Sequence, residues 1–213
     1  YGAGGSAEKK RTCEIATIIK QKYGIEPLAH LTCINSSKEG ILSMLESLQK
    51  NGIENILALR GDRNPDIPPL DEYHYAYQLV QLIKEHGGFH ISGACYPECH
   101  VECENLETDI EHLKHKVTCG VSHLISQLFF DNEDFYSFYE KILAAGINVP
   151  VEAGIMPVVN KNQILRMVTL CGASLPKKFV KIINRYENNP QALYDAGVAY
   201  ASEQIIDLIS SGV

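Results

Sequence analysis

The sequence predicts an α/β fold, namely a (β/α)8 TIM barrel of which about five parallel strands lie in this chain. The first observation is a recurring junction, in which a glycine and an apolar residue follow a helix-like stretch and precede a short apolar run. The second is that these runs are apolar on both faces, as expected of strands buried in a parallel sheet. Because helix-like and strand-like segments alternate throughout, a parallel sheet is favoured over a sandwich. The junction glycines are Gly24, Gly52, Gly88, Gly120 and Gly146.

The expected strands are the apolar runs after these junctions. A glycine just past a helix C-terminus adopts the left-handed conformation at little cost, and the next apolar residue packs back on the helix. A further, weaker strand is expected near residues 171–175. The five clear strands are residues 28–33, 56–59, 90–96, 124–130 and 151–156.

The helices between the strands are predicted from capping residues and apolar spacing. Ser36, Ser37, Lys38 and Glu39 offer a capping box at the start of one helix. Apolar residues then recur at helical spacing, which predicts one buried stripe for each helix. An aromatic group at helical spacing is interpreted as core. The stripes are Ile41, Leu45 and Leu48, then Tyr75, Leu79 and Leu82, then Ile110, Leu113 and Val117, and the aromatic group is Phe135, Tyr136, Phe138 and Tyr139.

The two ends of the sequence resemble half-units of the repeat. Residues 1–5 are typical of a chain leaving a strand into a glycine-rich loop, and Ser211, Gly212 and Val213 repeat the junction at the other end. We therefore expect one domain, residues 1–213, that is incomplete at both ends. An open doubly wound sheet of five strands is the alternative, but a barrel also accounts for the half-units.

Composition narrows the class of protein. The chain has 213 residues, 45% of them hydrophobic, and a formal net charge of −7 without a run of Lys or Arg, so a nucleic-acid partner is not expected. No apolar stretch reaches the roughly 18 residues of a membrane span. Seven scattered cysteines, an odd number, favour a reducing, cytoplasm-type compartment over a disulfide framework.

Polar side chains follow each expected strand, and the group Arg60, Gly61 and Asp62 is the most informative. Active sites of barrels lie at the C-terminal ends of the strands. Gly61 would let a ligand approach the backbone, Arg60 could contact a phosphate bidentately, and Asp62 could stabilise a developing cation. The structural alternative is an Arg–Asp pair that closes a βα turn. The other groups are His30 with Thr32, Tyr96 with Glu98 and His100, Gln127 with Asp131, and Pro157.

These motifs, in this order and spacing, resemble the signature series of the 5,10-methylenetetrahydrofolate reductase family. The resemblance covers nearly the whole chain, residues 1–213. Each motif is weak alone, but the ordered set is specific. The motifs are residues 30–33 (HLTC), 59–62 (LRGD), 96–100 (YPECH), 127–131 (QLFFD) and 154–157 (GIMP).

The resemblance implies a flavoprotein in which FAD takes hydride from NAD(P)H and passes it to methylenetetrahydrofolate in a ping-pong reaction. Asp62 would also stabilise the cationic iminium form of the folate. Gln127 would bind the pterin or the nicotinamide, and Gln163 would reach the substrate. The family also implies a homo-oligomer or a larger complex. The FAD contacts would be Tyr1, Ala3, His30, Arg60, Gly61, Asp62, Tyr75, Ala76, Tyr96, His100, Asp109, His112 and Lys116.

Three departures from the family pattern keep alternatives open. The family's general acid is a Glu in a first-strand motif that would precede Tyr1, and the final strand would follow Val213. Without the acid, a non-catalytic flavin-binding subunit is an alternative. His112 stands where many relatives carry Asn.

The cysteines near His100 suggest a second alternative, a metal-dependent barrel enzyme. Cys95, Cys99 and Cys103 are spaced four and four, which matches neither zinc pairs nor the radical-cluster motif. Cys95 also falls within an expected strand. No metal site is therefore predicted.

Overall fold

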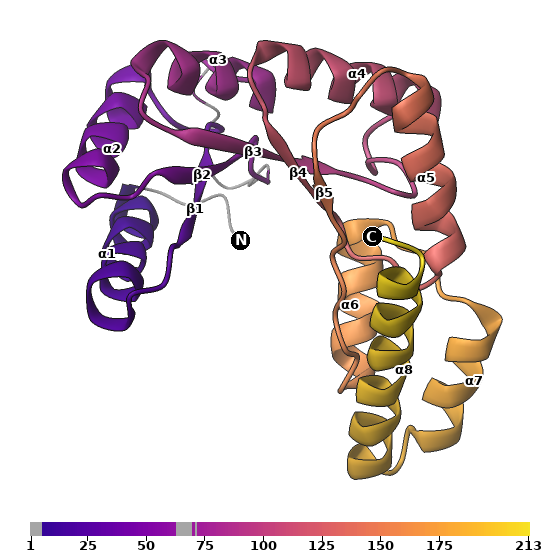
Figure 1. Ribbon diagram of the computed structural model, residues 1–213. Coiled ribbons are helices and arrows are strands. Elements are labelled where there is room, and N and C mark those ends of the chain that lie inside the picture. The colour runs from indigo at the N-terminus through magenta and orange to yellow at the C-terminus, as the bar shows by residue number, and fades with distance from the viewer. Residues whose placement is uncertain (1–5, 63–69, 71) are drawn as a thin grey trace. The chain divides into compact units, whose positions relative to one another are not determined.

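The computed structural model describes residues 6–62, 70 and 72–213 (Figure 1), so the predicted contacts Tyr1 and Ala3 lie outside the described residues. The side chains of residues 6–10 and of Lys161, Gln163, Leu165, Arg166 and Leu170 are likewise not described. The chain divides into two compact units, which are treated separately below. Unit 1 comprises Tyr1–Ala94 and His115–Leu124, and unit 2 comprises Cys95–Lys114 and Ile125–Val213.

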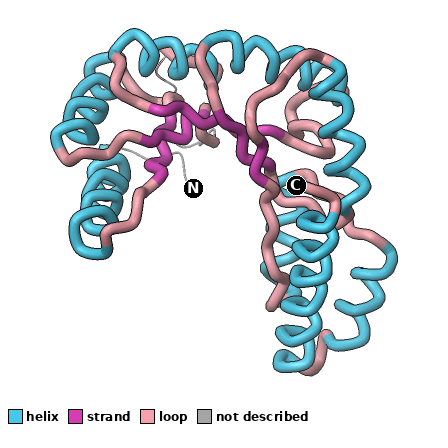
Figure 2. The backbone as a smooth tube through the Cα atoms, viewed as in Figure 1, coloured by secondary structure: helices cyan, strands magenta, loops and turns pink. Residues whose placement is uncertain are grey.

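Helices and strands alternate from α1 to α6, two further helices follow (Figure 2), and the predicted α/β class is confirmed. The strands form one sheet in the order β1-β2-β3-β4-β5. β1 and β2 pair in parallel from Leu28 opposite Asn55 to Thr32 opposite Leu59. The elements are α1 Ser6–Tyr23, β1 Leu28–Thr32, α2 Lys38–Lys50, β2 Asn55–Leu59, α3 Ala76–His86, β3 His90–Cys95, α4 Leu106–Cys119, β4 His123–Ser126, α5 Asn132–Ala144, β5 Val151–Glu152, α6 Lys161–Cys171, α7 Lys177–Tyr186 and α8 Pro190–Ser210.

The predicted glycine junctions are confirmed, because all five glycines have positive φ. The weak strand expected at residues 171–175 is wrong. Cys171 ends α6, and Gly172 (φ +71°) turns the chain out of the helix. The apolar signal there comes from Ala173, which is buried in a core cluster beside Phe179 rather than in a strand. No helix in the described part of the chain is long and apolar enough to cross a membrane.

In unit 1, α1 packs against α2 and β1, and α3 packs against β2 (Figure 1). The predicted stripe of α2 is confirmed, since Ile41, Leu45 and Leu48 are buried. The capping box is wrong in detail. Ser37 is the N-cap and accepts a hydrogen bond from the Gly40 backbone N–H, and glycine has no side chain to complete a box.

At the start of α3 the structure corrects the predicted stripe. Leu79 and Leu82 are buried, but Tyr75 is 58% exposed because it is the N-cap residue before Ala76. The side chain of Gln78 reaches back and accepts a hydrogen bond from the Tyr75 backbone N–H at 2.9 Å. The tyrosine ring therefore projects from the helix start and does not pack in the core.

The last two strands are shorter than predicted. β4 ends at Ser126 and β5 has only two residues. The next residues after β4 still alternate, because Leu128 and Phe130 belong to one core cluster and Phe129 to another. Residues 128–130 therefore lie between two apolar clusters and alternate like a strand in sequence. They do not continue the ladder of hydrogen bonds that defines β4.

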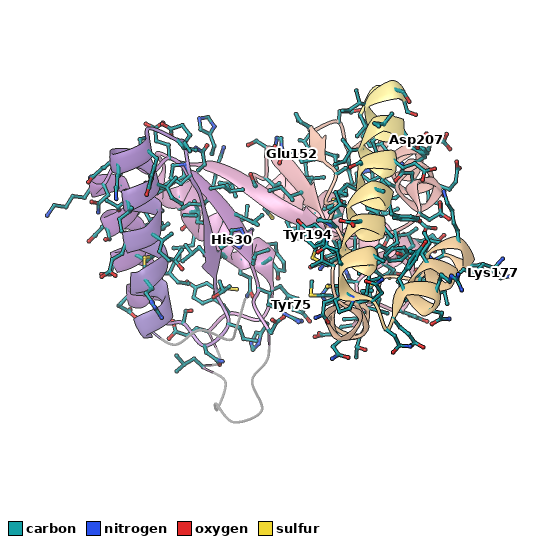
Figure 3. The ribbon with its side chains drawn as sticks, turned by 90° about the horizontal axis from the view of Figure 1, so that it is seen from below. His30, Tyr75, Glu152, Lys177, Tyr194 and Asp207 are labelled. Atoms are coloured by element: carbon teal, nitrogen blue, oxygen red, sulfur yellow. The ribbon has the colours of Figure 1, made fainter. Side chains whose placement is uncertain are left out.

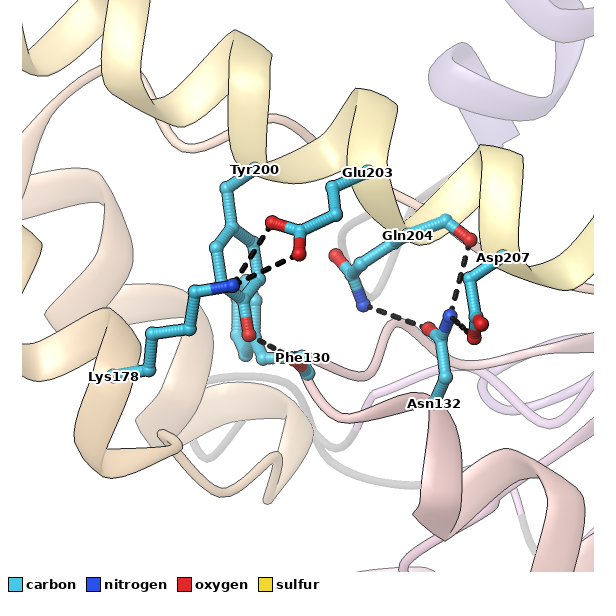
Figure 4. A network of polar contacts seen from close by, with 7 residues as sticks. All are labelled: Phe130, Asn132, Lys178, Tyr200, Glu203, Gln204 and Asp207. Carbon is cyan, nitrogen blue, oxygen red and sulfur yellow. Dashed lines mark hydrogen bonds and ion pairs between the residues drawn. The ribbon is translucent and has the colours of Figure 1, made fainter.

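Helix α8 is hydrogen-bonded to the segment after β4 (Figure 4). The Tyr200 hydroxyl donates to the Phe130 carbonyl at 2.6 Å, and the Gln204 amide donates to the Phe129 carbonyl at 3.4 Å. Gly197 lies on the same buried stripe of α8, where a Cβ would overlap the carbonyl of Val158. Hydrogen bonds and a close backbone contact thus place α8 in unit 2.

Candidate functional site

The first group of predicted site residues lies in unit 1, at the exits of β1 and β2. The parallel ladder continues past both strands: the Cys33 N–H donates to the Leu59 carbonyl at 3.2 Å and the Ile34 N–H to the Arg60 carbonyl at 2.8 Å. The Arg60 side chain turns back, and its Nε donates to the Gly61 carbonyl at 3.2 Å. The backbone at these strand ends is therefore held by hydrogen bonds where a barrel enzyme would bind its ligand.

Gly61 is required by the close approach of the two strand exits. Its φ is +88°, and a Cβ there would lie 2.9 Å from Ile34 Cγ2 and 3.0 Å from Thr32 Cβ. A side chain would therefore meet both an unfavourable backbone conformation and two crowded neighbours. Crowding by the protein itself therefore explains a glycine at this position, and the approach of a ligand to Gly61 stays a prediction.

Replacing Gly61 by alanine is expected to lower the free energy of unfolding by about 2 kcal/mol, because strain and steric overlap add. Gly24→Ala is the matched control in unit 1. Gly24 also has positive φ (+65°), but no described atom lies within 4 Å of its Cβ, so only the conformational part should be lost. Urea denaturation of both variants measures the difference. Equal losses would show that the strand exits do not crowd this position.

Two further predicted contacts of unit 1, His30 and Tyr75, are exposed (Figure 3). His30 points away from the face of β1 that buries Ala29 and Leu31. The part of the His30 ring that is covered loses hydration, and this lowers its pKa below the ordinary value of 6.5. Tyr75 is tied to the strand exit through Cys33, whose thiol donates to the Tyr75 carbonyl at 3.7 Å.

Lys116, also in unit 1, is held by the backbone of β3. Its Nζ donates to the Ala94 carbonyl at 2.6 Å. An ammonium group has three N–H donors, so this hydrogen bond fixes the side chain while leaving it able to donate to a second group. The Lys116 side chain also passes within 3.6 Å of the Cβ position of Gly93. The lysine predicted to contact FAD is therefore anchored at the end of β3.

The second group lies in unit 2, in the loop after β3 and at the start of α4. The rings of Tyr96 and His100 meet edge to face, with centroids 4.7 Å apart. The His100 backbone N–H donates to Asp109 Oδ2 at 2.9 Å, and the Glu102 N–H donates to His100 Nδ1 at 3.1 Å. Because Nδ1 accepts, the neutral His100 ring carries its proton on Nε2.

Asp109 also meets two side chains that were not linked by the sequence. Ligand atoms of Cys103, Asp109 and His112 all lie within 4.8 Å of one another. Asp109 and His112 are three residues apart on α4, so they share a face of the helix. The sequence does not link Cys103 to these two residues, because its spacing of six residues to Asp109 and nine to His112 matches no common motif.

The thiol of Cys99 lies beside this cluster. Burial, followed by the charges of Asp109 and Cys103, raises the pKa of Cys99 to about 11. Its φ of +82° is uncommon for a residue with a side chain. Cys99 is therefore a protonated thiol at neutral pH, on a strained backbone and close to acidic groups.

The remaining predicted residues are in unit 2. The Gln127 backbone N–H donates to the Cys95 carbonyl at 2.7 Å, and its Oε1 accepts from the Leu128 N–H at 2.9 Å. Gln163 is on α6, but its side chain is not described. Two polar residues at strand exits have structural partners: Asp131 caps α5, and Glu98 accepts from the Ser174 N–H at 2.9 and 3.1 Å.

Comparison with known proteins identifies the family. A family model of methylenetetrahydrofolate reductase matches residues 1–213. The 5,10-methylenetetrahydrofolate reductase of Pectobacterium carotovorum subsp. carotovorum is 36% identical over 213 residues, which span 100% of this chain and 70% of that protein. The chain belongs to the methylenetetrahydrofolate reductase family. The family consists of oxidoreductases of one-carbon metabolism that act on folate.

Other relatives agree with this assignment. The methylenetetrahydrofolate reductase of Escherichia coli is 34% identical, over 100% of this chain and 71% of its own length. Methylenetetrahydrofolate reductase (NADH) 1 of Arabidopsis thaliana is 33% identical, with 38% of its length covered. The predicted resemblance is therefore confirmed over the whole chain.

A solved structure supports the TIM-barrel type of fold. It is an uncharacterized protein from Clostridium thermocellum, described as binding two copies of 5-methyl-5,6,7,8-tetrahydrofolic acid. The TM-score is 0.61 at 13% identity, and the match covers 91% of this chain and 65% of that one. At this identity the likeness concerns the fold alone.

Proposed function

We propose that this chain is part of an enzyme that reduces 5,10-methylenetetrahydrofolate to 5-methyltetrahydrofolate, with FAD as the hydride carrier and NAD(P)H as the donor, in a ping-pong reaction. The family match over residues 1–213 carries the proposal. The remaining support is the chemistry of the residues that the structure places at the strand exits and at the start of α4.

The described side chains suit a flavin dinucleotide. Arg60 offers a guanidinium, which pairs well with a pyrophosphate. Asp109, oriented by the His100 N–H, offers carboxylate oxygens to ribose hydroxyls. Tyr75 in unit 1 and Tyr96 in unit 2 each offer an aromatic face. When bound, FAD would supply the two-electron chemistry, and the protein would supply placement and electrostatics.

The chain's own residues would then have distinct tasks. Arg60 and Lys116 would bind and position anionic or carbonyl groups of the cofactor. Asp62, which is exposed beyond β2, would place a negative charge near the iminium cation of the folate. Gln127 would orient the pterin ring through its amide, and the same amide would serve the nicotinamide. A shared binding face for the two substrates is the physical basis of the ping-pong order.

Two half-reactions in the full-length protein test the proposal. After incubation with FAD and removal of the excess, anaerobic NADH or NADPH should bleach the flavin absorbance. Methylenetetrahydrofolate should then restore it, with one 5-methyltetrahydrofolate formed per flavin. Protein that stays colourless after FAD, or a reduced flavin that the folate does not reoxidise, would contradict the proposal.

A pair of arginine variants tests the cofactor contacts. Arg60→Leu should weaken FAD binding roughly 10- to 100-fold, the loss typical of a hydrogen-bonded charge. Arg11→Leu is the matched control, since Arg11 is exposed on α1. Equilibrium titration with FAD measures both. Equal affinities of the two variants for FAD would show that Arg60 does not contact the cofactor.

Three further points stay predictions: the homo-oligomer or larger complex, the single-domain organisation and the cytoplasm-type location. The sequence leaves NADH and NADPH open as the electron donor. The half-reaction experiment distinguishes the two donors, because NADH and NADPH can be compared at equal concentration.

A further inference from the structure

We propose that Ser126 is a positioning residue, whose hydroxyl fixes the backbone of Gln127 at the exit of β4. The hydroxyl accepts a hydrogen bond from the Gly154 backbone N–H at 2.8 Å and donates one to the Gln127 carbonyl at 2.9 Å. It therefore connects the exit of β4 to the segment that follows β5. Because Gln127 is proposed above to bind the pterin and the nicotinamide, this role of Ser126 rests on the proposed function.

The burial of Ser126 makes its hydroxyl informative. Leu124 and Ser126 are the buried residues of β4, and only 6% of Ser126 is exposed. An apolar side chain at such a position would stabilise the fold by its burial, whereas a buried hydroxyl costs free energy unless it is hydrogen-bonded. The hydroxyl is therefore explained by the two hydrogen bonds that it makes, and not by packing.

The hydroxyl of Ser126 acts where the strand pairing has ended. β5 consists of Val151 and Glu152, so Gly154 lies beyond the strand. At Gly154 a side-chain oxygen, and not a strand carbonyl, accepts the backbone N–H. The two segments are in direct contact, because a Cβ at Gly154 would overlap the Ser126 carbonyl oxygen. Ser126 thus extends the attachment between the two segments as far as Gln127.

Both polar groups of the Gln127 backbone are hydrogen-bonded. Its N–H donates to the Cys95 carbonyl at 2.7 Å, and its carbonyl accepts from the Ser126 hydroxyl. Its side chain is oriented as well, since Oε1 accepts the Leu128 N–H at 2.9 Å. The NH2 group then lies on the other side of the amide carbon, where it can donate to a ligand. Among these partners, Ser126 contributes a side chain, so a substitution can remove its hydrogen bond alone.

Ser126→Ala in the full-length protein with FAD should weaken the binding of methylenetetrahydrofolate and of the nicotinamide together. We expect roughly a 3- to 10-fold loss for each, the effect of one neutral hydrogen bond. The concentration dependence of the two half-reactions in stopped flow gives both dissociation constants. The affinity for FAD should not change, because the proposed FAD contacts include neither Ser126 nor Gln127. A merely structural role would lower stability without moving the two substrate constants in parallel.

Two variants serve as controls for the loss of the hydroxyl. Ser126→Thr keeps the hydroxyl and adds a methyl group that suits a strand, so it should bind both substrates as the wild type does. Ser92→Ala removes a hydroxyl of matched burial, since Ser92 is 7% exposed and lies before the end of β3. It should leave both substrate constants unchanged.

A double-mutant cycle tests whether Ser126 acts through Gln127. In the Gln127→Ala background, Ser126→Ala should cause little further loss of substrate binding, because the side chain that it positions is gone. Equal losses in the two backgrounds would overturn the proposal. A Ser126→Thr protein as stable as the wild type that binds like Ser126→Ala would overturn it as well.

Hydrogen exchange gives a readout that needs no activity. Exchange of the Gly154 amide should be faster in Ser126→Ala than in the wild type or Ser92→Ala, because the amide loses its acceptor. Mass spectrometry of peptides that contain residue 154 measures the exchange. If the wild type performs neither half-reaction, the proposed function fails, and the exchange rate still tests the bridge. Unchanged exchange in Ser126→Ala overturns the positioning role whatever the activity.

Discussion

Alanine at Gly197 should lower the free energy of unfolding by about 3 kcal/mol, a loss at the upper end for overpacking. Gly197 is buried on α8, and a Cβ there would overlap the carbonyl of Val158. Neither partner is a flexible side-chain end, so α8 or the backbone near Val158 would have to move. Such a movement would also strain the hydrogen bond from Tyr200 to Phe130, one turn further along the helix.

Helix propensity opposes this effect but is smaller, since alanine is favoured over glycine by about 1 kcal/mol within a helix. Gly40→Ala is the control that isolates propensity. Gly40 is exposed in the first turn of α2, and its Cβ would meet only Ser37 Oγ at 3.3 Å. We expect Gly40→Ala to be neutral or slightly stabilising in urea denaturation. If Gly197→Ala behaves like Gly40→Ala, the close contact between α8 and Val158 is contradicted.

Asp62→Asn in the full-length protein should slow reduction of the folate on the order of 100-fold, the usual effect of removing one preorganised charge stabiliser. The change keeps the size of the side chain and removes its negative charge. Hydride transfer from nicotinamide to flavin forms an aromatic pyridinium whose positive charge is spread over the ring, and not a localised iminium cation, so that half-reaction should slow less. Stopped-flow measurement of the two half-reactions separates the effects.

Asp131→Asn is the control for the same change of charge. Asp131 also follows a strand, but its side chain caps α5 by accepting the Glu133 N–H. Asparagine caps as well as aspartate, so neither stability nor either half-reaction should change much. Equal slowing of both half-reactions by Asp62→Asn would count against a role specific to the folate cation.

The parts of the fold that depend on local chemistry were predictable. A glycine after an apolar helix stripe has few alternatives to a left-handed C-terminal turn, and Gly24, Gly52 and Gly146 all adopt it. The position of Arg60 and Gly61 at the end of a strand was predicted from the same glycine junctions, because they show where each strand begins. The error at residues 128–130 is instructive, because burial between two core clusters produces strand-like alternation without strand pairing.

Features that depend on particular side-chain or backbone contacts, rather than on periodicity, were not predictable. Tyr75 fits an apolar stripe by spacing, yet the Gln78 side chain starts the helix after it and leaves the ring exposed. The approach of Gly197 to Val158 needs the path of the chain between them. The Cys103, Asp109 and His112 cluster is local, but its spacing matches no common motif, so the geometry had to be seen first.

A ribosome makes the segment 129–132 long before it makes the helix that completes its hydrogen bonds. The bonds from Tyr200 and Gln204 to this segment join residues 70 to 75 positions apart. At a synthesis rate of about 5–20 residues per second, the delay is on the order of several seconds. During that time Phe129 and Phe130 lack their cover from α8, which favours transient contact with chaperones. We therefore expect unit 2 to complete folding only after α8 has left the ribosomal exit tunnel.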